Sequence, residues 1–210
     1  MIHGLYIIIP AKNEKKNLLK VIKKFNQYGK IIVVNDNSID TTKSIAEKKA
    51  FKVINNNQTY GYDLSLRKGI KEVIKLKNAK YILTIDADDQ HPAINLRKMM
   101  HFMKSYDLII FNRKKLSRVS EYIVDFFSRK FFSIKDPLSG MKLYKTIIMK
   151  KKISKLNIKE DYIGMFFFKI FNIKKILNFE INTNNSNKES SFGNGLFTNI
   201  KIIKAFIKSI

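Results

Sequence analysis

The chain has 210 residues, of which 45% are hydrophobic, and contains no cysteine. This length predicts a single domain with one core, and the lack of cysteine excludes disulfides and thiolate metal sites. The formal net charge is +24, but residues 1–105 carry +11 and residues 106–210 carry +13, so no arm or tail concentrates it. Because no nucleic-acid recognition motif accompanies the charge, we expect no binding to nucleic acid.

Short apolar runs alternate with amphipathic stretches along the chain. This alternation is typical of strands joined by crossover helices, and it predicts an α/β fold with a mostly parallel, Rossmann-like sheet and helices on both faces. Strands are predicted at residues 5–9, 31–34, 51–54, 81–85 and 108–111. Helices are predicted around Leu18, Ile22 and Phe25, from Ser38 or Asp40 to Lys49, at 62–77, from Pro92, at 117–132 and at 196–210. Beyond Asp136 the alternation weakens.

The sequence divides into three parts. Residues 1–180 are expected to form the α/β domain, and residues 181–195, rich in Asn, Ser and Gly, a flexible loop. Residues 196–210 are expected to form a basic amphipathic helix. The start of the chain does not resemble a signal peptide, and no apolar run approaches the roughly 20 residues that span a bilayer. We therefore expect a cytoplasmic protein that reaches a membrane, if at all, only at its cytoplasmic face.

Polar residues follow three of the predicted strands immediately. These clusters are residues 10–14, 35–40 and 86–90. In open parallel sheets, the loops at the carboxyl ends of the strands converge and form the ligand site. The three segments are therefore expected to meet at one edge of the sheet.

The acidic run at residues 86–90 carries the most specific chemistry. Asp86 and Asp88 place two hard carboxylate ligands at a strand end, and Gln90 could add a neutral oxygen, a set that suits Mg²⁺ or Mn²⁺. Such an ion would bridge the diphosphate of a nucleotide sugar and stabilise the charge of the leaving group. The alternative is that Asp86 to Asp89 only form a turn and cap the helix after Pro92.

Four segments resemble, in order and spacing, the motifs of family 2 glycosyltransferases. They are residues 7–14 (IIIPAKNE), 33–41 (VVNDNSIDT), 86–92 (DADDQHP) and 136–140 (DPLSG). The dolichyl and polyprenyl phosphate sugar transferases are the most similar branch. The resemblance implies the GT-A fold, transfer with inversion from a UDP- or GDP-sugar, and a divalent Mg or Mn cofactor.

The resemblance also implies roles for individual residues. Pro10, Asn13 and Glu14 would line the nucleoside pocket, and Asp36 would contact the base or ribose. Asp86 would lie near ribose and phosphate, and Asp88 with Gln90 would hold the metal. Arg113 and Arg118 match positions of phosphate-contacting arginines, for which the donor fork of a guanidinium is well suited. The alternative for both arginines is a solvated helix charge.

The chain departs from the family pattern at three places. Asn35 replaces a usual aspartate, and Asp63 and Ser65 replace a usual glycine and alanine. After Thr183 the family commonly supplies an arginine and another basic residue, whereas this chain offers Asn185, Ser186, Lys188 and Ser191. Lys188 is the candidate substitute there.

The acceptor decides which further groups are needed. A polyprenyl phosphate already presents a charged oxygen and needs no strong general base, whereas a saccharide hydroxyl needs one. Asp136, Glu160 and Asp161 are the candidate bases, and each has a surface or capping role as its alternative. We favour the polyprenyl phosphate. The alternatives are a glycan acceptor in surface glycan synthesis and a non-catalytic, basic membrane-binding relic.

Two aromatic groups fit either core packing or contact with a lipid. The first contains Phe126, Phe127, Phe131 and Phe132, and the second contains Tyr162, Phe166 to Phe168 and Phe171. A basic C-terminal helix in the headgroup region would support the lipid interpretation, which implies peripheral membrane association.

Overall fold

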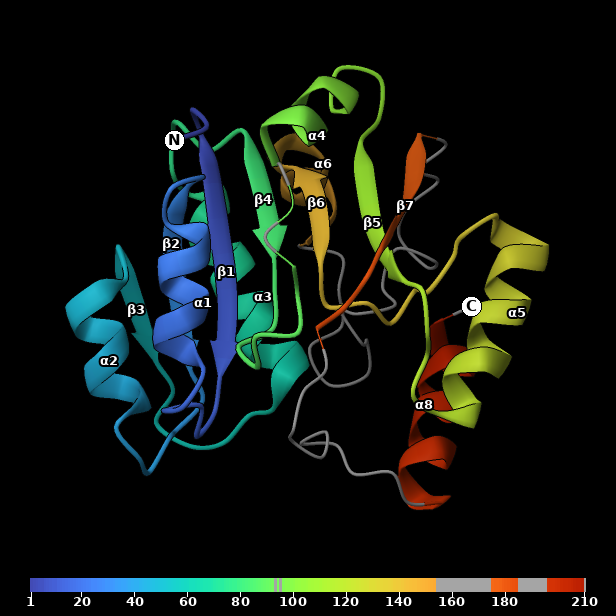
Figure 1. The fold of residues 1–210 in the computed structure, drawn as a ribbon, viewed down its shortest axis with the longest axis horizontal. Helices are drawn as coiled ribbons and strands as arrows, with labels where there is room; N and C mark the ends of the chain where they lie inside the picture. Colours follow the sequence, from blue (N-terminus) through green and yellow to red (C-terminus); the bar gives the residue numbers. More distant parts are fainter. Residues whose placement is uncertain (93, 95, 154–174, 185–195, 210) are drawn as a thin grey trace.

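A seven-stranded sheet forms the centre of the computed structural model, which describes residues 1–92, 94, 96–153, 175–184 and 196–209 (Figure 1). The strands lie in the order β3-β2-β1-β4-β6-β5-β7. β6 is antiparallel to both of its neighbours, and the other pairs are parallel. The strands are β1 Leu5–Ala11, β2 Lys30–Asn35, β3 Lys52–Asn55, β4 Tyr81–Thr84, β5 Leu108–Arg113, β6 Lys142–Lys145 and β7 Ile176–Ile181.

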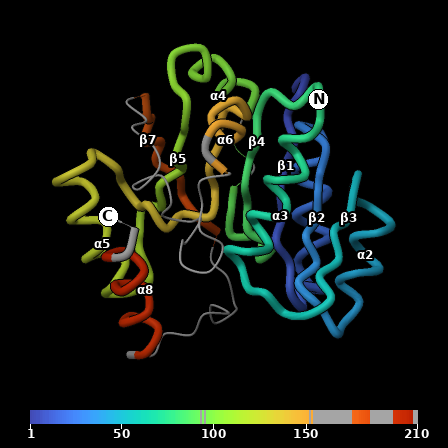
Figure 2. The backbone as a smooth tube through the Cα atoms, turned by 180° about the vertical axis from the view of Figure 1, so that it is seen from behind, coloured from blue at the N-terminus to red at the C-terminus, as the bar shows by residue number. Residues whose placement is uncertain are grey.

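Helices cover both faces of this sheet, as Figures 1 and 2 show from opposite sides. The described helices are α1 Leu18–Phe25, α2 Thr42–Lys49, α3 Tyr62–Ile74, α4 Leu96–Phe102, α5 Val119–Phe132, α6 Thr146–Lys152 and α8 Leu196–Ser209. In β1, Ile7 and Ile9 face α1 and α4, whereas Ile8 faces α3. This alternation produces two apolar layers, because successive side chains of a strand point to opposite faces.

α5 and α8 form a separate pair beyond β5 and β7. The two helices lie side by side in both views, at the end of the molecule opposite α2 (Figures 1 and 2). Val124 of α5 packs against Ala205 and Phe206 of α8 in a small apolar cluster. None of the described helices is long and apolar enough to cross a membrane.

The structure confirms the predicted α/β architecture and corrects several bounds. α4 begins at Leu96 rather than at Pro92, because the N–H of Ile94 bonds to the carbonyl of Pro92 two residues before it, which is not a helical bond. α3 ends at Ile74, before the predicted Lys77. Asp40 satisfies a first-turn N–H of α2, donated by Thr42 at 2.9 Å, although the helix cap itself is at Thr41.

The weak pattern beyond Asp136 hid β6, α6 and β7. β6 has the sequence KLYK, and its charged Lys142 is buried, so neither alternation nor hydrophobicity marks it as a central strand. Pairing with β4 and β5 on its two sides decides its structure. The predicted loop at residues 181–195 falls mostly outside the described residues.

Candidate functional site

The loops after β1 and β2 are bonded to each other at the carboxyl ends of the strands. Asn13 has a positive φ of 54° and accepts the N–H of Ile39 at 2.9 Å, while its own N–H donates to Ser38 Oγ at 3.1 Å. The N–H of the buried Glu14 donates to Thr42 Oγ1 at 2.8 Å. The structure thus brings the predicted Asn13 and Glu14 to the end of β2.

Asp36 organises the loop that leads into α3. Its Oδ1 accepts the N–H of Tyr60 at 2.8 Å and the side-chain amide of Asn56 at 2.7 Å, and its Oδ2 accepts the N–H of Gly61 at 2.8 Å. Gly61 has a φ of 87°, which favours glycine at this turn. Asp36 is therefore a buried anchor, and its contact with a base or ribose stays a prediction.

Two departures from the family pattern have structural roles in this region. The hydroxyl of Ser65, which is fully buried, accepts a hydrogen bond at 3.0 Å from the Asn56 amide that also binds Asp36. Asn35 donates to Asn55 Oδ1 of the neighbouring strand at 2.9 Å. Pro10 lies buried in β1 opposite Val34 of β2.

Asp86 lies just beyond β4 and is held from three directions. His91 Nε2 lies 3.1 Å from its Oδ2, and the hydroxyl of Tyr62 in α3 hydrogen-bonds to the same carboxylate. Gly140 lies so close that a Cβ on it would be 2.1 Å from Oδ2. Thr84 fixes this approach by donating its hydroxyl to the Gly140 carbonyl at 2.8 Å. The Asp86 side chain remains 31% exposed and can still meet a ligand.

The rest of the acidic loop is bonded on two sides. Asp88 Oδ1 accepts the N–H of Gln90 at 3.1 Å, which closes a local turn. Asp89, with a φ of 66°, forms an ion pair with Lys24 of α1, which also donates to the carbonyl of His91 at 3.0 Å. Asn184, beyond β7, donates to the carbonyls of both Gln90 and Asp89, at 2.9 and 3.2 Å.

Two carboxylates in this loop interact electrostatically. Burial raises the pKa of Asp88, and the nearby charge of Asp86 raises it further, with a smaller contribution from Glu14. Burial also opposes ionisation of Asp86, but the hydrogen bond and charge of His91, the Tyr62 hydroxyl and the charge of Arg113 outweigh it and lower the pKa of Asp86. The loop therefore holds an ionised carboxylate beside one whose charge is disfavoured.

This donor set fits a divalent ion. A cation between the two carboxylates would relieve the repulsion that raises the pKa of Asp88, and their oxygens are ligands that Mg²⁺ and Mn²⁺ prefer. Within the described ranges, no group of three or more His, Cys, Asp or Glu side chains is arranged to hold a metal. The arrangement suits an ion that takes its other ligands from phosphate and water.

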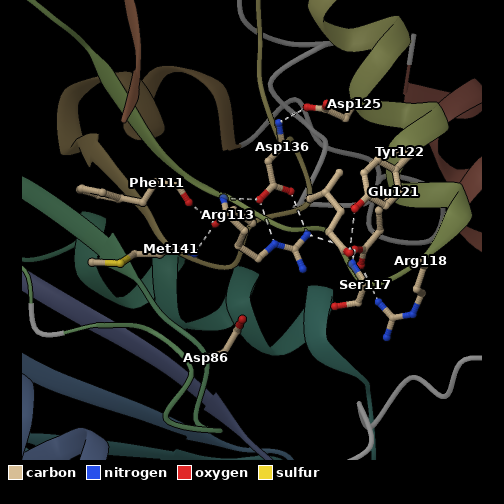
Figure 3. A network of polar contacts seen from close by, with 12 residues as sticks. Asp86, Phe111, Arg113, Ser117, Arg118, Glu121, Tyr122, Asp125, Asp136 and Met141 are labelled. Carbon is tan, nitrogen blue, oxygen red and sulfur yellow. Dashed lines mark hydrogen bonds and ion pairs between the residues drawn. The ribbon is translucent and has the colours of Figure 1, made fainter. Parts of the chain in front are cut away.

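The two predicted arginines converge on one buried carboxylate (Figure 3). Glu121 of α5 accepts from Arg118 Nη1 at 2.6 Å and lies 3.5 Å from Arg113 Nη2. Arg113 also donates to both carboxylate oxygens of Asp136, at 2.9 and 2.8 Å. The N–H of Asp136 in turn donates to Asp125 of α5 at 2.7 Å. Both arginines are mostly buried and ordered by carboxylates, so they are not solvated helix charges.

A pocket of about 380 Å³ adjoins this network. Arg113 is one of its lining residues, and the negative charge of Asp86 acts on this arginine. Its lining combines basic groups with aromatic and aliphatic ones: Arg113, Lys114, Leu116, Tyr122, Asp125, Phe126, Arg129 and Asp136.

Lys142 is a buried cation next to the site that the sequence did not reveal. Its Nζ donates to the carbonyl of Ser139 at 2.5 Å, and its side chain is 3% exposed. Burial lowers the pKa of Lys142 to about 8, although the charges of Asp136 and Asp86 offset part of this effect. A lysine in a short strand carries no sequence signal of burial, since only the antiparallel pairing of β6 places it inside.

Other structural partners were also missed. In the sequence alone, Glu121 and Asp125 look like ordinary charged residues of an amphipathic helix, and Tyr62 looks like the first residue of a helix. The spacing of the two acids, four residues apart on one face of α5, was the available signal. Several predicted groups lie outside the described residues: Glu160, Asp161, the aromatic group at 162–171, Asn185, Ser186, Lys188 and Ser191.

Comparison with solved structures defines the class of fold. Glucosyl-3-phosphoglycerate synthase from Mycobacterium tuberculosis, in complex with phosphoglyceric acid, matches with a TM-score of 0.74 at 14% sequence identity, over 99% of this chain and 80% of that chain. The same enzyme in complex with Mn²⁺, UDP-glucose and phosphoglyceric acid gives a TM-score of 0.73 at 14% identity, with the same coverage. The fold is the GT-A fold of glycosyltransferases, as predicted.

The family follows from the sequence comparisons. The model of glycosyl transferase family 2 matches residues 6–172. Two proteins of Methanocaldococcus jannaschii are also similar. The uncharacterized protein MJ0544 is 30% identical over 165 residues, which is 68% of this chain and 72% of that protein. The uncharacterized protein MJ1222 is 33% identical over 113 residues, 52% of this chain and 46% of that protein. The chain belongs to glycosyl transferase family 2.

Replacing Gly140 by alanine should displace Asp86. The new Cβ would lie 2.1 and 2.3 Å from the two carboxylate oxygens, so the acidic loop must move. We expect the Mn²⁺-dependent affinity for a nucleoside diphosphate, measured by calorimetry, to fall at least about tenfold, the equivalent of about 1.4 kcal/mol. The matched control is Gly29→Ala, whose Cβ would lie 2.7 Å from the Leu5 carbonyl at the opposite end of β1. This control should lose stability and keep its affinity; equal affinity in Gly140→Ala and wild type would contradict the assignment.

Lys142 should make the stability of the protein depend on pH. Because folding lowers its pKa from 10.5 to about 8, the unfolded chain binds more protons between these values. The free energy of unfolding should therefore gain roughly 3 kcal/mol from this group as the pH rises through that interval. Urea unfolding measured at several pH values across this interval should show this gain in the free energy of unfolding for wild type, relative to Lys142→Met. The exposed Lys71→Met should follow wild type, and parallel curves for wild type and Lys142→Met would refute the burial of a charged amine.

Proposed function

We propose that the protein transfers a sugar from a UDP- or GDP-sugar to a polyprenyl phosphate, with inversion at the anomeric carbon. The observation that carries the acceptor class is the pocket at Arg113, whose lining joins arginines to aromatic side chains. The arginines suit a phosphate, and the aromatic side chains suit a prenyl chain. Residues 1–180 would carry the reaction, and residues 181–195 would connect them to the C-terminal helix.

The donor would bind along the carboxyl ends of β1, β2 and β4. Pro10, Asn13 and Glu14 would line the nucleoside pocket with Asp36, since the loops of β1 and β2 meet there. Asp86, Asp88 and Gln90 would hold Mg²⁺ or Mn²⁺ against the diphosphate. When bound, this ion would neutralise the charge that grows on the departing nucleoside diphosphate. Solved structures of a protein with the same fold contain Mn²⁺ together with UDP or UDP-glucose, which supports this donor class.

The acceptor phosphate would be positioned by Arg113 and Arg118. Asp136 engages Nε and Nη2 of Arg113 and fixes the plane of the guanidinium, so that Nη1 can present donors to phosphate oxygens. Arg118, at the N-cap of α5, is held by Glu121, the same carboxylate that lies 3.5 Å from Arg113 Nη2. An ordered guanidinium loses less side-chain entropy when it binds phosphate.

The reaction would be a direct displacement. An anionic oxygen of the acceptor phosphate would attack the anomeric carbon, while the bond from that carbon to the β-phosphate oxygen breaks and the nucleoside diphosphate leaves with the electron pair. Attack opposite to the leaving group inverts the anomeric configuration. A hydroxyl acceptor would need a general base, but Asp136 is committed to Arg113 by two hydrogen bonds. The commitment of Asp136 to Arg113 therefore favours a phosphate acceptor over a hydroxyl acceptor.

A polyprenyl phosphate resides in a membrane. The proposal therefore includes transient association of the protein with a membrane surface, at the cytoplasmic face, where nucleotide sugars are available.

Donor binding can be tested by thermal unfolding with a panel of UDP- and GDP-sugars, with and without Mn²⁺. A donor at 100 times its Kd should stabilise the wild type by about 2.7 kcal/mol, a shift of several degrees in Tm. Asp88→Asn should lose most of the Mn²⁺-dependent part of the shift. Asp107→Asn, which only removes an ion pair with Lys145 at the start of β5, should retain it. A wild type that no donor stabilises, with or without Mn²⁺, would indicate a non-catalytic relic.

The acceptor class can be tested with radiolabelled donor and a membrane extract or a synthetic prenyl phosphate. We expect label in an organic-extractable product, and NMR of this product should show the anomer opposite to that of the donor. Arg113→Lys should reduce transfer at least about tenfold while donor binding persists, because an ammonium cannot reproduce the paired fork. Label that appears only in water-soluble or polymeric glycan would replace the polyprenyl phosphate by a saccharide acceptor.

A further inference from the structure

The α5–α8 pair exposes several large apolar side chains. Phe126 and Phe131 of α5 are 61% and 63% exposed, and Phe197 of α8 is 82% exposed. We call this surface the α5–α8 face; its exposed apolar residues are Val119, Tyr122, Ile123, Phe126, Phe127, Phe131 and Phe132 of α5 and Phe197, Ile200 and Ile207 of α8. Contiguous exposed apolar surface of this kind marks an interaction site in a folded protein.

The exposed residues of α5 form a continuous stripe. Val119, Ile123, Phe127 and Phe131 recur at intervals of four residues and therefore lie above one another on the helix. The Phe127 and Phe131 rings are stacked with centroids 6.2 Å apart, and Phe126 meets Phe127 edge-on at 5.5 Å. Val124, which borders this stripe on the helix, is buried and packs against α8. The stripe is thus an ordered surface beside the core and not part of it.

The exposed charged side chains that the structure describes in α5 and α8 are all basic. Both acids of α5 are buried: Glu121 pairs with Arg113 and Arg118, and Asp125 pairs with the exposed Arg129. Lys130 is exposed. α8 has no acidic residue, and its Lys201 and Lys204 are exposed as well. Exposed aromatic rings together with exposed basic side chains complement an anionic lipid surface, where rings enter the interface and cations meet headgroup phosphates.

We propose that the α5–α8 face docks the protein onto an anionic lipid bilayer. The aromatic stripe of α5 would enter the boundary between headgroups and acyl chains, and Lys130, Lys201 and Lys204 would lie at the level of the phosphates. Membranes bind such surfaces through two contributions, the burial of apolar side chains and the attraction between lysines and anionic headgroups. Added salt screens the attraction and therefore weakens the binding, but it does not abolish the apolar contribution.

Docking in this orientation would place the pocket beside the bilayer. Tyr122 and Phe126 belong both to the exposed face and to the pocket wall, which they share with Arg113. A phosphate carried by a membrane-bound prenyl chain could then reach the arginine while its chain stays among the lipids. This last consequence rests on the proposed function, but the docking does not.

The experiment is flotation of the full chain with vesicles of phosphatidylcholine alone and of phosphatidylcholine mixed with phosphatidylglycerol. We expect binding to the mixed vesicles and a fall of at least about tenfold in the affinity of Phe127→Ser/Phe131→Ser, since two rings that would enter the bilayer are lost. Lys201→Glu/Lys204→Glu should lose most of the preference for anionic vesicles. The control is Phe51→Ser, which removes a ring of similar exposure, 54%, next to β3 at the opposite end of the sheet.

Two readouts separate this proposal from the others. Thermal unfolding and donor binding should be unchanged in the Phe127 and Lys201 variants, which shows that they are folded. Transfer to a water-soluble, short-chain prenyl phosphate tests the reaction without a membrane, so either proposal can fail alone. The docking surface is refuted if wild type fails to float with anionic vesicles, or if Phe127→Ser/Phe131→Ser floats as well as wild type. It is equally refuted if the protein forms a dimer that the Phe127→Ser/Phe131→Ser substitutions dissociate and that anionic vesicles do not dissociate. That result would make the α5–α8 face a dimer interface.

Discussion

The site is built around the packing of Gly140 against the carboxylate of Asp86. β4 and β6 run antiparallel, and this pairing carries the backbone of residues 139–141 across the end of β4. Only a residue without a side chain fits there, because a Cβ would overlap both carboxylate oxygens. The same contact fixes Asp86 between Tyr62 and His91, and so determines where an ion or a phosphate can approach.

From this contact the polar structure extends in two directions. Towards β1 and β2, the acidic loop is tied to α1 by Lys24, while the neighbouring loops are tied to each other through Asn13 and Ser38. Towards β5 and α5, Arg113 is ordered by Asp136 and Glu121. The acidic side suits a metal-bound diphosphate and the basic side suits a second anionic group. A transferase that joins the two substrates needs these two environments side by side.

The acidic residues of α5 are buried, whereas its basic residues are exposed. The acids of α5 turn inward to order the arginines, and the outer side of the helix is left with aromatic and basic residues. One helix therefore serves both the interior of the site and the exposed α5–α8 face. The physical reason is helical periodicity, since residues 121, 125 and 128 share one side of the helix and residues 123, 127 and 131 share another.

The sequence alone determined the elements whose signals are local. The apolar run Ile7 to Ile9, the repeated strand and helix pattern, and the polar clusters after β1, β2 and β4 were sufficient for the α/β class and for the meeting of those loops. The ordered motifs were sufficient for the family. The residues that hold the site in shape were not accessible in this way. The burial of Lys142 and the need for a glycine at position 140 arise from contacts between segments distant in the chain. Such contacts exist only once β6 has inserted between β4 and β5, because that insertion, and no local preference of its four residues, decides which side chains are removed from water.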